Sequence, residues 1–119
     1  MDPVSEDLNP YLYWALCVGV YDGDSVTLDI SLGLGVYMHN QKIRLLGIDT
    51  PELRGEERPL GLQARDRLRE LILDKWLLVE TVFDRTGKYG RLLGTLYHDS
   101  VNINQLLLDE GLAEPYGSS

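Results

Sequence analysis

The sequence predicts one domain of the mainly β class with helices, in which five strands close into a small barrel in the order βββαββα. Two observations lead to this fold. The 119 residues suffice for one hydrophobic core without a disulfide. Three strand-like segments with short links precede a helical segment, and two further strand-like segments separate it from a second helix.

The first three strands are expected in the first half of the chain. Tyr11 to Val20 is rich in aromatic and branched residues, which favour strands. Ser25 to Ile30 alternates polar and apolar residues, as in a strand that is buried on one face. Gly33 and Gly35 mark the next reversal, and Val36 to Leu46 returns as the third strand. The short links predict an antiparallel meander.

The next segment is expected to form an amphipathic helix over about residues 60–73. Its apolar residues Ala64, Leu68 and Ile72 recur at helical spacing. Two more strands follow, Trp76 to Phe83 and Leu92 to Tyr97. Their place after the helix provides the fourth and fifth strands of the barrel.

A second helix is expected to begin at Asn102, a residue type that caps helices, and to end at Gly111. A five-stranded antiparallel sheet with a helix between strands three and four suits a barrel of the oligonucleotide-binding kind, the OB fold. The domain would span residues 11–114, with flexible ends at residues 1–10 and 115–119.

Composition limits the possible functions. The net charge is −8, from 19 acidic and 11 basic side chains, which does not suit binding of nucleic acid over a broad basic face. A single cysteine, Cys17, excludes an internal disulfide, and two histidines cannot complete a zinc site of the usual spacing. Any metal ion must therefore bind to oxygen atoms.

The start of the chain lacks the basic residues and long apolar core of a secretion signal, and no apolar stretch approaches 18 residues. We therefore expect a cytoplasmic protein without a membrane partner, unless a leader has been removed. A monomer is also expected.

Two arginines are candidates for binding phosphate. Arg44 and Arg91 can each present a planar fork to two phosphate oxygens, which lysine cannot do. Taken singly, each would also suit a solvated charge at a strand end or a surface ion pair. Their position beside acidic motifs favours the phosphate clamp.

The acidic motifs are candidates for binding a cation. Asp22 and Asp24 are two residues apart and point to one face of an extended chain, although Asp-Gly-Asp is also a common turn. Calcium prefers oxygen ligands, and Asp24, Asp49 and the carbonyl group of Thr50 could offer three. Asp22 could instead orient a metal-bound water.

A bend is expected between Arg44 and Asp49. These residues are five apart, so a regular strand would place them on opposite faces. They can share a pocket only if the chain bends between them, and Gly47 is where a bend costs least.

Glu52 follows this bend and is a candidate general base. Pro51 ends strand pairing because it has no N–H group, which leaves Glu52 free to lean toward a water molecule over the phosphate. The alternative for Glu52 is a surface ion pair with Arg54 or Arg58.

Aromatic residues have two possible roles. Tyr89 and Tyr116 could stack on a base or donate a hydrogen bond to phosphate, or they could pack on the rim of the barrel. Trp14, Trp76 and Cys17 suit strand positions that face the core.

With these motifs in order, the chain resembles the thermonuclease, or staphylococcal nuclease-like, domain family over about residues 18–113. The segments that carry the resemblance are Asp22–Asp24, Ile43–Glu52, Asp84 with Lys88–Arg91, and Val101–Ala113. The resemblance implies the barrel fold and hydrolysis of DNA and RNA with calcium as the cofactor.

The resemblance also implies where a cation would bind. Calcium would be bound by Asp24, Asp49 and the carbonyl oxygen of Thr50, and Asp22 would assist at the same site.

The catalytic and substrate-binding roles follow from the same resemblance. Glu52 would activate water, and Arg44 and Arg91 would hold the phosphate. Lys88 and Tyr89 would contact the terminal phosphate or base of a nucleotide.

The leading hypothesis is thus a calcium-dependent nuclease that acts on single-stranded DNA or RNA. The alternative is a non-catalytic module of the same fold that binds nucleic acid or a protein partner. The complete set of acids and arginines favours the enzyme. The acidic net charge and a shorter C-terminal region are the main departures from the family pattern.

Overall fold

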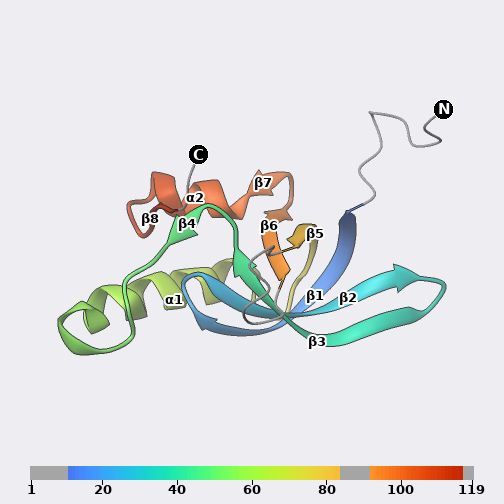
Figure 1. Cartoon of the computed structure of the whole chain (residues 1–119), viewed down its shortest axis with the longest axis horizontal. Coiled ribbons are helices and arrows are strands. Elements are labelled where there is room, and N and C mark those ends of the chain that lie inside the picture. Colours follow the sequence, from blue (N-terminus) through green and yellow to red (C-terminus); the bar gives the residue numbers. More distant parts are fainter. Residues whose placement is uncertain (1–10, 84–91, 117–119) are drawn as a thin grey trace.

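The computed structural model describes residues 11–83 and 92–116 as a closed barrel with two helices (Figure 1). The strands of the barrel are neighbours in the order β3-β2-β1-β5-β6, and β3 also pairs with β6. They are β1 (Leu12–Asp22), β2 (Ser25–Gly33), β3 (Val36–Leu45), β5 (Trp76–Phe83) and β6 (Leu92–His98). The five-stranded OB-type barrel expected from the sequence is confirmed.

The remaining elements connect and cover the barrel. They are β4 (Ile48–Asp49), the 3₁₀ turn η1 (Gly55–Glu57), α1 (Arg58–Ile72), β7 (Val101–Asn102), α2 (Ile103–Asp109) and β8 (Glu114–Pro115). The first helix begins two residues earlier than expected, with proline in its first turn, where its missing N–H group costs nothing. The side chain of Asn102 accepts a hydrogen bond from the N–H group of Gln105, so the expected cap of α2 is confirmed.

One pairing differs from the expected antiparallel sheet. The closing strands β3 and β6 are parallel, with Ile43 opposite Leu92 and Leu45 opposite Gly94. The reason is geometric, since directions cannot alternate all the way around a ring with an odd number of strands. Closure of the five-stranded ring therefore requires at least one parallel pair.

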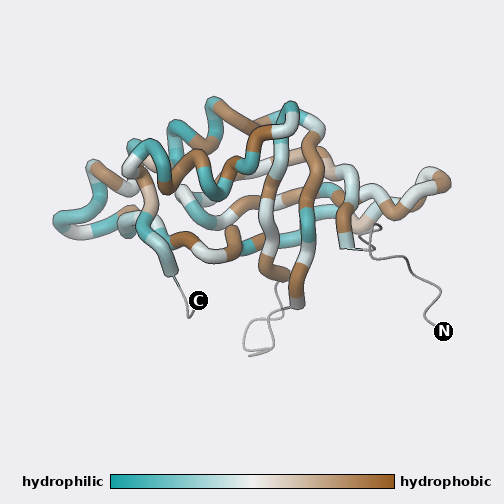
Figure 2. The backbone as a smooth tube through the Cα atoms, turned by 90° about the horizontal axis from the view of Figure 1, so that it is seen from above, coloured by the Kyte–Doolittle hydropathy of each residue, from teal (hydrophilic) through white to brown (hydrophobic). Residues whose placement is uncertain are grey.

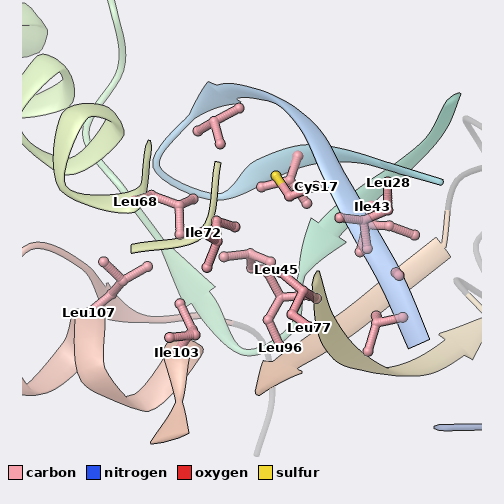
Figure 3. Packing of buried hydrophobic residues seen from close by; sticks show 14 of the residues in the cluster. Cys17, Leu28, Ile43, Leu45, Leu68, Ile72, Leu77, Leu96, Ile103 and Leu107 are labelled. Carbon is pink, nitrogen blue, oxygen red and sulfur yellow. The ribbon is translucent and has the colours of Figure 1, made fainter. Parts of the chain in front are cut away.

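The core lies where the inward faces of the strands meet the two helices (Figure 3). Leu68 and Ile72 reach in from α1, and Ile103 and Leu107 reach in from α2. Cys17 is fully buried, as expected, and burial raises the pKa of its thiol to about 11.

The expectation for the two tryptophans was wrong. Trp14 is 58% exposed and Trp76 is 48% exposed, whereas the adjacent Ala15 and Leu77 are buried. Side chains alternate across a strand, so burial of Ala15 and Leu77 puts both indoles on the outside of the barrel. Apolar character alone did not reveal which face was inward.

The hairpin of β2 and β3 extends away from the barrel, on the side opposite α1 (Figure 1). Its tip is apolar, as the colouring by hydropathy shows (Figure 2), and Leu34 at the turn is fully exposed. At the other end of the chain, β8 extends secondary structure to Pro115, one residue past the expected domain boundary. No helix in the described ranges is long and apolar enough to cross a membrane.

A buried amide ties α2 to the barrel. The side chain of Asn104 donates to the carbonyl oxygens of Leu46 (2.9 Å) and Gly94 (3.1 Å), and it accepts from the N–H group of Leu96 (3.1 Å). It is 5% exposed, so water cannot easily replace these bonds. Asn104 therefore fixes the end of β3 against β6.

Replacement of Asn104 by alanine should lower the free energy of unfolding by about 2–3 kcal/mol, because it leaves buried backbone groups unsatisfied. Urea denaturation would measure the loss. Asn102→Ala is the matched control on the same helix and should cost about 1 kcal/mol, the usual value of a cap. Equal losses in the two variants would contradict the bridging role of Asn104.

Candidate functional site

A cavity of about 930 Å³ opens between β2, β3 and the segment that follows β4. It brings together side chains that are well separated in the sequence. The predicted site residues along its lining are Asp22, Asp24, Arg44, Asp49, Thr50 and Glu52.

The chain bends sharply between Arg44 and Asp49. Strand β3 ends at Leu45, and Gly47 has a φ of 80°, a conformation that favours glycine. After the bend, Asp49 Oδ1 lies 3.4 Å from Arg44 Nη2. The N–H group of Tyr116 donates to the carbonyl oxygen of Gly47 (2.9 Å) and holds the bend from the C-terminal side. The predicted bend at Gly47 is confirmed.

Arg44 is held inside the cavity by a second carboxylate. Its Nη1 lies 2.8 Å from Asp24 Oδ2, and the two side chains are 13% and 9% exposed. This contact buries Nη1 against the carboxylate. Arg44 also lines the cavity, so a ligand there would meet the other N–H groups of its guanidinium group.

Asp24 is anchored from several directions. Its Oδ2 accepts from the N–H group of Thr50 (3.0 Å), and its Oδ1 accepts from the hydroxyl of Ser25 (3.3 Å). Its own N–H group donates to Asp22 Oδ1 (3.0 Å). These bonds join the turn after β1 to the segment after β4.

The two neighbouring carboxyl groups have opposite pKa shifts. Burial, followed by hydrogen bonding to Asp24 and the charge of Asp24, raises the pKa of Asp22 to about 6. Burial also opposes the charge of Asp24, but hydrogen bonds from Asp22 and from the N–H group of Thr50, together with Arg44, outweigh it and lower the pKa of Asp24. Asp22 therefore carries the proton of this pair near pH 5.

Glu52 is exposed at the edge of the same cavity. None of the ion pairs among described residues involves it, and Arg58 instead donates to the carbonyl oxygen of Leu53 (2.8 Å). The alternative of a surface ion pair with Arg54 or Arg58 is therefore not found. The carboxylate of Glu52 is accessible to water and to a ligand.

Two glycines let α1 press against the site. A Cβ atom on Gly23 would lie 2.7 Å from Ala64 Cβ and 2.8 Å from Thr50 Cγ2. One on Gly61 would lie 2.8 Å from the carbonyl oxygen of Pro51 and closer still to that of Glu52. Sequence reasoning missed this role of Gly61, although a glycine inside a predicted helix is a signal of close packing.

Tyr116 lies against Arg44. The Cζ atom of the guanidinium is 5.2 Å from the centroid of the ring, within the range of a cation–π contact. The expected alternatives for Tyr116, contact with a base or phosphate or packing on the rim, stay predictions. In the structure the ring helps to orient the arginine, through a contact that no sequence pattern indicated.

Three predicted site residues, Lys88, Tyr89 and Arg91, lie outside the described residues. Their proposed roles stay predictions. Leu92, which opens β6, lines the cavity and pairs with Ile43.

The residues of the cavity suit a hard cation in chemistry and in charge. No three His, Cys, Asp or Glu side chains within residues 11–83 and 92–116 gather closely enough to hold a metal by themselves. Asp24, Asp49 and the carbonyl group of Thr50 nevertheless offer only oxygen donors, which calcium prefers. The acidic residues of the lining outnumber its basic ones, so a cation that shares its ligands with water and substrate fits here.

Comparisons with known proteins agree with this geometry. A family model described as staphylococcal nuclease homologue matches residues 42–118. Endonuclease YncB of Bacillus subtilis is 37% identical over 98 residues, which cover 75% of this chain and 46% of that protein. The SPbeta prophage-derived endonuclease YokF of the same organism is 41% identical over 75 residues, which cover 60% of this chain and 25% of that protein.

A thermonuclease of Staphylococcus hyicus is 27% identical over 99 residues, which cover 81% of this chain and 55% of that protein. The chain thus spans about half or less of the length of these relatives.

In the presence of a chelator, the chain should become less stable as the pH rises from about 4 to about 6. The pKa of Asp22 is raised from 3.8 to about 6 in the fold, so its stabilising contribution is complete below pH 4 and is lost as the pH rises through 6. The lowered pKa of Asp24 changes the stability only below about pH 4, outside this range. Thermal unfolding of the wild-type chain and Asp22→Asn should show a flatter profile for the variant. If the stability of Asp22→Asn fell with pH as steeply as that of the wild-type chain, the titration of Asp22 would not be the cause.

Gly61→Ala should destabilise the chain by about 1–3 kcal/mol, because the new methyl group would collide with backbone oxygens of the segment 51–52. Helix propensity alone predicts the opposite sign, a gain of about 0.5–1 kcal/mol. Thermal unfolding distinguishes the two. Gly19→Ala is the control, because its Cβ would meet only Thr27 at 3.7 Å. Stabilisation by Gly61→Ala would show that α1 does not press on the site.

Proposed function

The chain belongs to the staphylococcal nuclease homologue family, and on that premise we propose that it hydrolyses phosphodiester bonds of DNA and RNA with the help of calcium. The single observation that carries the proposal is the guanidinium group of Arg44. It lines the cavity together with carboxylates, and contacts with Asp24 and Asp49 hold it there. A phosphate group is the ligand that such a fork fits best.

Arg44 would bind the phosphate and neutralise charge that develops on its oxygens. Its orientation is already restricted by Asp24, by the carbonyl oxygen of Ile48 (3.3 Å) and by the ring of Tyr116. A side chain that is held before substrate arrives loses little entropy on binding. Arg91 is proposed as a second arginine on the same phosphate.

Glu52 would act as the general base. Its exposed carboxylate at the edge of the cavity can accept a proton from a water molecule as the water oxygen attacks phosphorus. The bond from phosphorus to the leaving oxygen then breaks, and this oxygen would take up a proton from solvent. Close packing of α1 through Gly61 against the backbone of Pro51 and Glu52 would restrict where the Glu52 side chain can move.

Asp24, Asp49 and the carbonyl group of Thr50 would hold the cation, with Asp22 next to them. Calcium bound there would supply positive charge for the phosphate oxygens and orient the attacking water. The four acids of the cavity otherwise repel a polyanion. Because the net charge of −8 also disfavours wide contact with a duplex, single-stranded DNA or RNA is the proposed substrate.

Glu52→Gln should lower the rate of cleavage of a single-stranded DNA oligonucleotide by about 10²–10⁴, because it removes the base. Arg44→Lys should lower it by a similar factor, since lysine cannot form the fork. Excess chelator should abolish cleavage by the wild-type chain, and added calcium should restore it. Gel electrophoresis of the products measures all three effects.

Glu56→Gln, on the exposed turn η1, is the matched control and should cleave like the wild-type chain. Circular dichroism should show the same fold in every variant. Cleavage that persists in chelator, or in Glu52→Gln, would contradict the proposal. Tight binding of the oligonucleotide without turnover would favour the non-catalytic alternative.

A further inference from the structure

A second groove, of about 460 Å³, lies on the outer wall of the barrel, apart from the cavity that holds Arg44. Among described residues, none lines both hollows. The groove runs over the outward faces of β1, β5 and β6 and ends at the turn before β7. The proposed nuclease chemistry gives it no role.

The register of the strands places a row of large side chains across this wall. Trp14 on β1 is opposite Leu78 on β5, and Leu78 is opposite Tyr97 on β6. Trp76 lies two residues from Leu78, so it shares the same face and is a diagonal neighbour of Trp14. Both indoles and the phenol ring of Tyr97 line the groove.

These side chains are unusually open to solvent. Trp14, Trp76 and Leu12 are 58%, 48% and 39% exposed. On the hairpin side, the ring of Tyr37 lies 6.5 Å from that of Trp76 and extends the aromatic surface. A contiguous exposed apolar patch of this kind commonly marks a site of interaction.

The charged residues of the groove are acidic, which favours a positively charged ligand. Glu80 and Asp99 belong to its lining, and no lysine or arginine of the described chain does. Burial, followed by the charge of Glu80 and a hydrogen bond to it, raises the pKa of Tyr97, so Glu80 lies next to that ring. Asp99 also faces His98, with 3.5 Å between its Oδ2 and His98 Nδ1. A nucleic acid could stack on the indoles, but these carboxylates would repel its phosphates.

We propose that the groove binds a positively charged side chain, arginine or lysine, of an extended basic peptide from a partner protein. The faces of Trp14 and Trp76 attract a cation through their π electrons, and guanidinium also stacks on them. Glu80 and Asp99 supply opposite charge in the lining of the same groove. The apolar stem of the peptide side chain would cover Leu12 and Leu78. This proposal does not depend on the proposed nuclease activity.

Intrinsic fluorescence provides a direct test, because Trp14 and Trp76 are the only tryptophans of the chain. The full chain would be titrated in chelator with synthetic octapeptides of glycine and serine that contain two arginines, two lysines or two glutamines. We expect a saturable change in fluorescence with the arginine and lysine peptides. At least tenfold weaker binding is expected with the glutamine peptide.

Variants separate the contribution of the aromatic rings from that of the carboxylates. Trp76→Leu should weaken binding of the arginine peptide about tenfold, whereas Trp76→Phe should weaken it less, because a ring face remains. Asp99→Asn should weaken binding severalfold, and less so at high salt. Asp74→Asn is its matched control: both aspartates are exposed and have positive φ values (50° and 63°), which asparagine tolerates, and Asp74 lies outside the groove.

Three results would overturn the proposal. They are equal binding of the glutamine and arginine peptides, no response to any peptide at millimolar concentration, and a response to a thymidine oligonucleotide in place of the basic peptides. Because Trp76 is outside the cavity, Trp76→Leu should cleave oligonucleotides like the wild-type chain. A failure of the groove can thus be told apart from a failure of the nuclease proposal.

Discussion

The buried contact between Arg44 and Asp24 is the interaction on which the site depends. A guanidinium group this deep in a fold needs an opposing charge, because an unpaired buried ion is costly. Asp24 provides that charge and is itself tied to Thr50, so one ion pair connects three segments of the chain. The fold thus holds the arginine in place while its side chain still lines the cavity.

Closure of the barrel sets where that arginine points. A ring of five strands needs a parallel pair, and here β3 and β6 provide it beside the cavity. The pair ends where Asn104 binds the carbonyl groups of Leu46 and Gly94, and β3 cannot continue past that point. The chain then turns at Gly47 and returns Asp49 toward Arg44. The topology of the barrel and the chemistry of the site are therefore coupled at one short segment.

Local patterns in the sequence predicted the regular elements and the bend. The spacing of apolar residues, and the alternation of side chains across a strand, can both be read from neighbouring residues. The five-residue separation of Arg44 and Asp49 was enough to require the turn at Gly47. Contacts between distant segments had no such pattern. The strands β4 and β8 pair with each other and bring Tyr116 to Arg44. Each has only two residues, which is too short to show a period. The outward position of Trp14 and Trp76 was missed because an apolar side chain does not reveal which face of a strand is buried. The roles of Lys88, Tyr89 and Arg91 stay predictions, since these residues lie outside the described ranges.

The acidic character of the chain has different consequences at its two hollows. In the cavity, Asp22, Asp24, Asp49 and Glu52 exceed the charge of Arg44 and Lys42, so a small cation could neutralise them where the phosphate is proposed to bind. In the outer groove, two carboxylates accompany exposed indoles, which favours an organic cation over a metal ion. No described residue lines both hollows. A peptide cation in the groove would therefore leave the carboxylates of the cavity without a partner unless its own chain extended there. On this argument, a basic partner would bind the groove without displacing a cation from the cavity.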